Sequence, residues 1–303
     1  MLIDKLLTNE GIFVNPSWTD EQKEFYFAKS HWMDGGDPIK NLKAKLKEAV
    51  CFDIDNIFDI YSYKLINEGV AVSDFPNIKM PFSVMWFENK CFGKEYQDGN
   101  YRVTGFYNKR VGTLLFENDY RDGLYSILAF GFILPENEES IAIGGWWEIQ
   151  YDEQGKLVPH IQYPMMPGEV LENKEAFWGN SLTWFLLMPL ASISFMHCKN
   201  VVIQSIEPPI ALQKARIRKH KLPFVAYKTL EIKPMVKILR EEGESETKGM
   251  KNALHICRGH FKDFTKGKGL FGRNKGLYWW ESQVRGDAET GIIAKDYKVT
   301  PKK

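Results

Sequence analysis

The sequence predicts an α+β protein with N-terminal helices, a central antiparallel sheet packed by a buried helix, and a small basic β-rich C-terminal module. Three observations predict this class. Residues 1–50 space their apolar side chains as helices do, residues 81–151 alternate short strand-like runs with Gly, Asn and Asp turns, and a long apolar run ends at His197.

The N-terminal helices are predicted by caps and periodicity. Residues 17–21 offer a helix cap followed by acidic first-turn residues, and residues 41–50 place an apolar side chain at every fourth position. Residues 51–65 also fit a helix better than a strand, because their apolar positions follow helical spacing. The N-terminal part is therefore expected to be largely helical.

Three aspartates, Asp53, Asp55 and Asp59, lie near the start of this last expected helix. Carboxylates so close together are compatible with a metal site, but no glycine turn or distal Glu completes a calcium loop. A solvated acidic helix N-terminus is the interpretation that we favour.

The middle of the chain is expected to form an antiparallel meander, because the connections between its strand-like runs are short. A buried helix (174–197) and a buried strand (201–206) are expected to complete this acidic body. The meander strands are expected at residues 81–88, 101–107, 112–117, 124–134 and 141–151.

The net charge of +1 conceals an uneven distribution along the chain. Residues 210–303 contain 22 Lys and Arg against 10 Asp and Glu, a net charge of +12, whereas residues 1–209 contain 18 against 29, a net charge of −11. This division predicts an acidic domain over residues 1–209 and a basic β-rich domain over residues 210–303. It indicates either an anionic partner for the basic part or a contact between the two parts, within one chain or between copies.

The expected location is the cytoplasm, without a membrane anchor. The four cysteines are widely spaced and form no Cys-x-x-Cys pair, which is typical of a reducing compartment. The first residues interrupt their apolar run with charge and do not resemble a signal peptide. The longest apolar run, Leu182 to His197, has 16 residues and contains Pro189, which is short of the ~20 that cross a bilayer.

The strongest basic run is residues 214–221, with five Lys and Arg in eight positions. Such a run suits a phosphate backbone, but a solvated linker, a strap over the acidic body and a localisation signal are alternatives. The strands of the basic domain are expected at residues 224–232, 253–258, 276–282 and 291–299, with a loop at 240–248.

Residues 267–272 match the dinucleotide-binding pattern G-x-G-x-x-G. That motif requires a helix after the turn, whereas an aromatic strand is expected here. Arg273 and Asn274 also replace the Lys and Ser/Thr of a phosphate-binding P-loop. The segment is therefore expected to be a glycine-rich loop, and no cofactor is predicted.

His255 and His260 are the candidate catalytic residues. Two histidines beside Arg258 have the chemistry of metal-independent phosphodiester cleavage, with one base, one acid and a cation for the developing charge. A structural pair of hydrogen-bonded histidines is the alternative that we favour. Together with Cys257 they supply three potential zinc ligands, but a fourth is missing at a recognisable spacing, and no metal is predicted.

Two Arg-Gly pairs, at residues 258–259 and 285–286, place a cation beside a residue that permits close approach of the backbone. They suit capture of phosphate or carboxylate, and internal ion pairs are the equally weighted alternative. The predicted anion-binding or nucleic-acid-binding residues are Lys214, Arg216, Arg218, Lys219, Lys221, Arg258, Arg273 and Arg285.

Two tryptophan pairs, Trp146-Trp147 and Trp279-Trp280, lie in expected strands. Adjacent strand residues point to opposite faces, so one indole of each pair is expected in the core. The other is a candidate for burial, for an interface in a homo-oligomer or for base stacking.

The last 90 or so residues carry a signature of His255, Arg258-Gly259-His260-Phe261, Leu270-Phe271-Gly272, Gly276, Trp279-Trp280, Arg285-Gly286, Tyr297, Val299 and Pro301. This signature resembles a family of phage- and prophage-encoded proteins of uncharacterised function. The resemblance implies an accessory protein of a virus or mobile element in the cytoplasm of a bacterial host, acting in host takeover or counter-defence.

Three functional hypotheses follow from these features. The leading one is a binding protein, not an enzyme, whose basic module docks on nucleic acid or on a host complex that handles nucleic acid, and which forms a homo-oligomer. The second is a metal-independent nuclease or toxin-like enzyme that uses His255 and His260. The third is a structural component of a virion.

Overall fold

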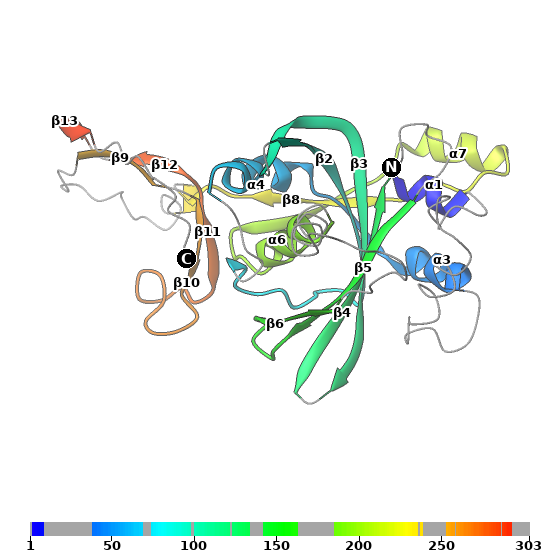
Figure 1. The fold of residues 1–303 in the computed structure, drawn as a ribbon, viewed down its shortest axis with the longest axis horizontal. Helices are drawn as coiled ribbons and strands as arrows, with labels where there is room; N and C mark the ends of the chain where they lie inside the picture. Colours follow the sequence, from blue (N-terminus) through cyan, green and yellow to red (C-terminus); the bar gives the residue numbers. More distant parts are fainter. Residues whose placement is uncertain are drawn as a thin grey trace. The chain divides into compact units, whose positions relative to one another are not determined.

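The computed structural model describes residues 2–8, 38–68, 74–97, 100–121, 123–133, 142–162, 185–235, 237–238, 253–257, 259–285 and 287–292 (Figure 1). The chain forms two compact units. Unit 1 contains residues 1–196 and 203–230, and unit 2 contains residues 197–202 and 231–303. The division differs from the expected cut after Pro209, because the basic run belongs to unit 1.

The fold is α+β, as the sequence predicts. The described helices are α1 (Leu2–Thr8), α3 (Pro38–Glu48), α4 (Asp55–Glu68), α6 (Leu187–Met196) and α7 (Ile210–Arg218). The described strands are β1 (Val50–Asp53), β2 (Val84–Gln97), β3 (Asn100–Arg121), β4 (Leu124–Ile133), β5 (Ala142–Tyr151), β6 (Leu157–Gln162), β7 (Val201–Ile206), β8 (Tyr227–Ile232), β9 (Ala253–Cys257), β10 (His260–Asp263), β11 (Leu277–Trp280), β12 (Gln283–Arg285) and β13 (Asp287–Ile292).

An eight-stranded sheet with the order β6-β5-β4-β3-β2-β1-β8-β7 forms the framework of the chain. Strands β2 to β6 form an antiparallel meander, which agrees with their short connections. Strand β1 is parallel to both β2 and β8, so the sheet is mixed. The antiparallel part was predictable from the sequence, whereas the parallel part was not.

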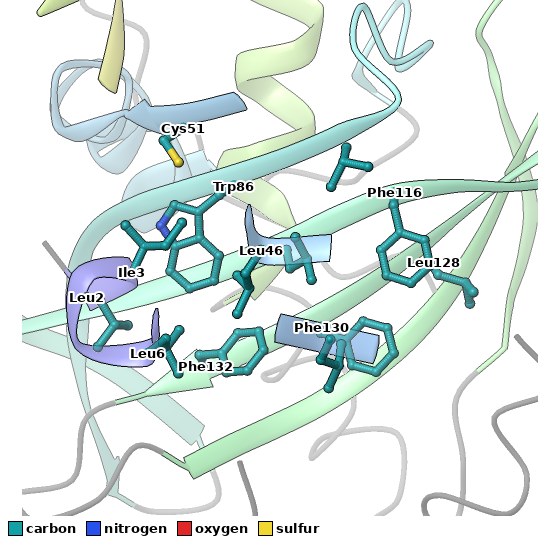
Figure 2. Packing of buried hydrophobic residues seen from close by; sticks show 13 residues of the cluster. Leu2, Ile3, Leu6, Leu46, Cys51, Trp86, Phe116, Leu128, Phe130 and Phe132 are labelled. Carbon is teal, nitrogen blue, oxygen red and sulfur yellow. The ribbon is translucent and has the colours of Figure 1, made fainter. Parts of the chain in front are cut away.

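One face of the sheet is covered by α1 and α3 (Figure 2). Leu2, Ile3 and Leu6 of α1 pack with Leu42 and Leu46 of α3, which confirms the four-residue spacing of that helix. The sheet contributes bulky alternate side chains to this cluster, namely Trp86, Leu114, Phe116, Leu128, Phe130 and Phe132.

The opposite face is covered by α4 and α6. The ring of Phe52 in β1 stacks on that of Phe87 in β2 at 5.4 Å between centroids, and Tyr61 of α4 meets Phe195 of α6 edge-on at 5.9 Å. Every residue of α6 from Leu187 to Phe195 is buried, which confirms the buried helix within the described residues. Residues 174–184 of that expected helix, like the expected cap at 17–21, lie outside the described residues.

Two local predictions were wrong. Residues Cys51 to Asp53 form a strand and not the start of a helix, because their backbone pairs with β2. Strand β7 has the expected bounds but is exposed at five of its six residues, because it is the edge strand of the sheet. The expected strands at 101–107 and 112–117 are two parts of the single strand β3.

Unit 2 contains two small sheets, β10-β11 and β12-β9-β13. Its described core joins Met235, Leu270, Tyr278 and Trp280. Fully buried Asn200 donates to the carbonyls of Lys233 (3.1 Å) and Trp279 (2.8 Å) and accepts from the backbone N–H of Trp279 (2.9 Å). A single amide therefore fixes three backbone groups of this unit.

Of the helices described here, none is both long enough and apolar enough to cross a membrane.

Candidate nucleic-acid interface

The basic run lies largely on helix α7. Pro209 precedes the helix, its Ala, Leu, Gln, Lys and Arg residues favour helix formation, and the chain leaves it at Lys219 and His220, where φ is 52°. Helix α7 contains no buried residue. A helix of this length without buried residues is not stable by itself, so other contacts must hold it in place.

That order comes from the segment that follows the helix. The side-chain amide of Gln213 donates to the carbonyl of Phe224 and accepts from its backbone N–H, both at 2.8 Å. Arg216 donates through Nε to the carbonyl of Leu222 at 2.7 Å, and its guanidinium lies 3.9 Å from the centroid of the Phe224 ring. Residues 210–222 therefore form a defined structure, which we call the basic arm.

The basic arm is attached to the rest of unit 1 through residues 225–227. The backbone N–H of Val225 donates to Oδ1 of Asp4 in α1 at 3.0 Å. The side chains of Val225 and Tyr227 pack against the core cluster of α1 and α3. Figure 1 accordingly shows α7 on the side of the sheet that carries α1 and α3.

The remaining cations of the arm project into solvent. Lys214, Arg218, Lys219 and Lys221 are exposed, and no described residue forms an ion pair with them. No Asp or Glu occurs between Glu207 and Glu231. Arg216 is half-buried and contacts the returning segment, so it helps to hold the arm together, and its anion-binding role stays a prediction.

Apolar side chains are exposed beside these cations. Ile210 is 72% exposed and Ile217 is 58% exposed, and both lie within one or two turns of Lys214 and Arg218. The outward side of α7 therefore mixes aliphatic and cationic side chains. Composition indicated the charge, but only the fold shows that the isoleucines are uncovered.

The two candidate catalytic histidines lie on different sheets. His255 lies in β9, where its backbone is paired with that of Arg285 in β12. His260 is exposed in β10, opposite Trp280 of β11. The register pairs the backbones of His255 and Arg285, and the side chains of both residues lie outside the described part of the chain. Arg258, the predicted cation between the histidines, lies outside the described residues.

The glycine-rich loop connects two strands. Residues 264–276 link β10 to β11, and no helix follows, which agrees with the exclusion of a dinucleotide site. A Cβ at Gly259, the glycine of the first Arg-Gly pair, would lie 2.7 Å from the ring of Trp279. Packing against this indole therefore requires a glycine at this position, whatever the neighbouring arginine binds.

The described tryptophan side chains of the two pairs are buried. Trp279 and Trp280 are both buried, so burial is the outcome among the three alternatives that were open for the second indole of this pair. Trp280 packs in the unit 2 core while Lys262 covers its ring at 4.0 Å, and Trp279 meets Phe261 edge-on at 4.8 Å. Trp147 is also buried in the sheet. The side chain of Trp146 does not belong to the described part of the structure.

Unit 1 contains a charged cluster around Arg110 whose pairing was not predicted from the sequence. Arg110 of β3 donates to Asp53 (3.1 Å), Asp55 (2.9 Å) and Glu88 (2.8 Å). Fully buried Glu88 also accepts from the backbone N–H of Leu2, at 2.9 and 2.8 Å to its two oxygens, and from Nε1 of Trp86 at 3.3 Å. No sequence signal connects these positions, because they are up to 86 residues apart.

The electrostatics of this cluster favour the charged arginine. Burial alone would lower the pKa of Arg110, but the charges of Asp53 and Glu88 and the hydrogen bond to Asp55 raise it above its ordinary value. Asp53 and Asp55 are thus paired with Arg110 and not merely solvated, and no group of side chains suited to a metal occurs among the described residues. The cluster connects α1, α4 and the sheet.

No protein-family model, no curated protein and no solved structure matches the chain.

Proposed function

We propose that the chain is a nucleic-acid-binding accessory protein whose basic arm contacts the phosphate backbone. The observation that carries this proposal is a helix that buries none of its residues and exposes cations free of ion pairs with described residues. Lysines and arginines that neutralise phosphates release condensed counterions, and this release drives sequence-independent binding. The resemblance to phage-encoded proteins supports an accessory role in a bacterial host.

The arm is suited to this task because its order does not depend on the exposed cations. Gln213 and Arg216 hold the helix against residues 222–224 and leave Lys214, Arg218, Lys219 and Lys221 available. Lys214 and Arg218 are four residues apart, so their positions along the helix differ by about 6 Å on the same side. Two neighbouring phosphates are within reach of such a pair.

The test compares the double variant Lys214→Glu with Arg218→Glu against the wild type for binding to labelled DNA and RNA over a range of salt concentrations. The slope of log K against log salt is expected to fall by about 2, with an affinity loss on the order of 50-fold at 0.1 M salt. The matched control, Lys47→Glu with Lys156→Glu, changes the net charge equally at exposed lysines outside the arm.

Equal loss of affinity in both double variants would show that net charge, and not the arm, attracts nucleic acid. Wild-type protein that binds neither DNA nor RNA at low salt would overturn the proposal. In that event the exposed Ile210 and Ile217 would favour a protein partner for the same helix.

A further inference from the structure

The loop between β10 and β11 is a closed and well-defined turn. The backbone N–H of Leu270 donates to the carbonyl of Asn274 at 2.8 Å, and the N–H of Asn274 donates to the carbonyl of Leu270 at 2.9 Å. The side chain of Leu270 is buried in the unit 2 core with Tyr278 and Trp280. These two hydrogen bonds and the burial of Leu270 therefore fix the backbone position of the next residue, Phe271.

Phe271 has a left-handed backbone conformation, with φ of 54°, and the residue is 38% exposed. Bulky residues are rare in this region of backbone space because their Cβ crowds the following carbonyl. The neighbouring Gly269 and Gly272 also have positive φ, as glycines tolerate. Because the ring of Phe271 is partly exposed, its burial offsets little of the free-energy cost of the positive φ. Strained backbone conformations of this kind are concentrated at functional positions.

The surroundings of Phe271 are cationic. Lys266, Lys268, Arg273 and Lys275 are exposed in the same loop, and no acidic residue occurs from Phe264 to Trp280. An aromatic ring among exposed cations is the combination by which proteins bind single-stranded nucleic acid: the ring stacks on a base and the cations contact phosphates. Stacking on a base face requires an unpaired base, which a single strand offers without the cost of opening a duplex.

We propose that the loop of residues 266–275 binds single-stranded nucleic acid, with Phe271 stacked on an unpaired base and the loop lysines at the phosphates. This inference rests on the proposed nucleic-acid-binding function and specifies its ligand class. The loop belongs to unit 2 and the basic arm to unit 1, so each contact is tested by its own variant.

The experiment measures fluorescence anisotropy of the full chain with a labelled oligothymidylate and with a duplex of equal length. Phe271→Gly removes the ring and relieves the strained backbone, so the variant is expected to unfold at the same or a higher temperature. Its affinity for oligothymidylate is expected to fall by about 5-fold to 100-fold, as loss of one stacked base predicts. Phe271→Asn, which also tolerates positive φ, is the second variant if Phe271→Gly does not fold.

The matched control is Ile60→Ala, which shortens the side chain of a residue of similar exposure, 39% against 38% for Phe271, on helix α4. Its affinity is expected to equal that of the wild type. Photocrosslinking to an oligonucleotide that contains iodouracil is expected to label Phe271 itself.

The outcomes separate this inference from the proposed function. Unchanged oligothymidylate affinity in Phe271→Gly, or a crosslink outside the loop, overturns the inference while the arm proposal stands. Preferential duplex binding that depends on Phe271 would show a wedge between base pairs and would also overturn it. Loss of binding in Phe271→Gly but not in the arm variant would overturn the arm proposal and keep the loop. Absence of binding to both probes overturns both.

Discussion

Arg110 donates through Nε to Oε1 of Glu88 at 2.8 Å, and the carboxylate that accepts this hydrogen bond is fully buried. Glu88 in turn accepts from the first described residue of α1, Leu2. One ion pair with a fully buried carboxylate thus joins β2 and β3 to the N-terminal helix. Removal of one partner from such a pair leaves an uncompensated buried charge, which costs far more than the pair contributes.

We expect Arg110→Met to lower the free energy of unfolding by about 3–5 kcal/mol, because Glu88 would remain buried without its cation. Urea unfolding followed by tryptophan fluorescence measures the change. Lys90→Met is the control, since its pair with Asp59 is exposed and 3.5 Å long and is worth at most about 1 kcal/mol. Equal costs for both variants would contradict a buried electrostatic role for Arg110.

Asn200 is expected to be essential to the order of unit 2. Asn200→Asp keeps the shape but replaces the donor that faces the carbonyls of Lys233 and Trp279 with an acceptor. We expect a loss of about 3 kcal/mol or more and a reduced near-ultraviolet circular dichroism signal. Asn274→Ala, in the loop, is the control and is expected to cost less than about 1 kcal/mol. A native-like Asn200→Asp spectrum and stability would refute this role.

Gln213 is expected to control the order of the basic arm and not of the whole chain. Gln213→Ala removes two hydrogen bonds to Phe224, worth roughly 1 kcal/mol each. Hydrogen exchange of the Phe224 amide is therefore expected to accelerate by about 30-fold while the exchange of the central strands is unchanged. Lys214→Ala, on the exposed side of the arm, should leave the Phe224 amide unaffected. Acceleration throughout unit 1 would contradict a local role.

The buried thiol of Cys51 predicts a loss of stability at alkaline pH. Burial, followed by the charges of Glu88 and Asp4, raises the pKa of Cys51 to about 12. Because the folded-state pKa is raised, the thiol stabilises the fold fully below its unfolded-state pKa near 9 and loses this contribution as the pH rises towards 12. The slope is at most about 1.4 kcal/mol per pH unit.

The measurement is the free energy of unfolding of Cys51→Ala and wild type between pH 8 and pH 11. As the pH rises above about 9, the free energy of unfolding of the wild type should fall more steeply than that of Cys51→Ala. Parallel pH profiles for the two proteins would show that Cys51 ionises as readily in the folded state as in the unfolded state.

Much of the secondary structure was predictable because its signals are local. The spacing of Leu42 and Leu46 predicted α3, the apolar run predicted buried α6, and the glycine and asparagine turns predicted an antiparallel meander. The candidate site was predictable in composition, since the five cations of residues 214–221 are adjacent in sequence. The sequence did not show that Arg216 differs from the other four cations. Arg216 holds the arm because the chain after α7 folds back and places Leu222 and Phe224 against it.

The sequence by itself determined the class of fold, the strand and helix signals, and the concentration of positive charge after residue 209. Only the tertiary structure decided that β7 is an exposed edge, that Arg110 neutralises a buried Glu88, and that Phe271 has a positive φ and is partly exposed. The physical reason is that periodicity and charge are properties of neighbouring residues, whereas burial and pairing depend on which distant strands and helices lie alongside.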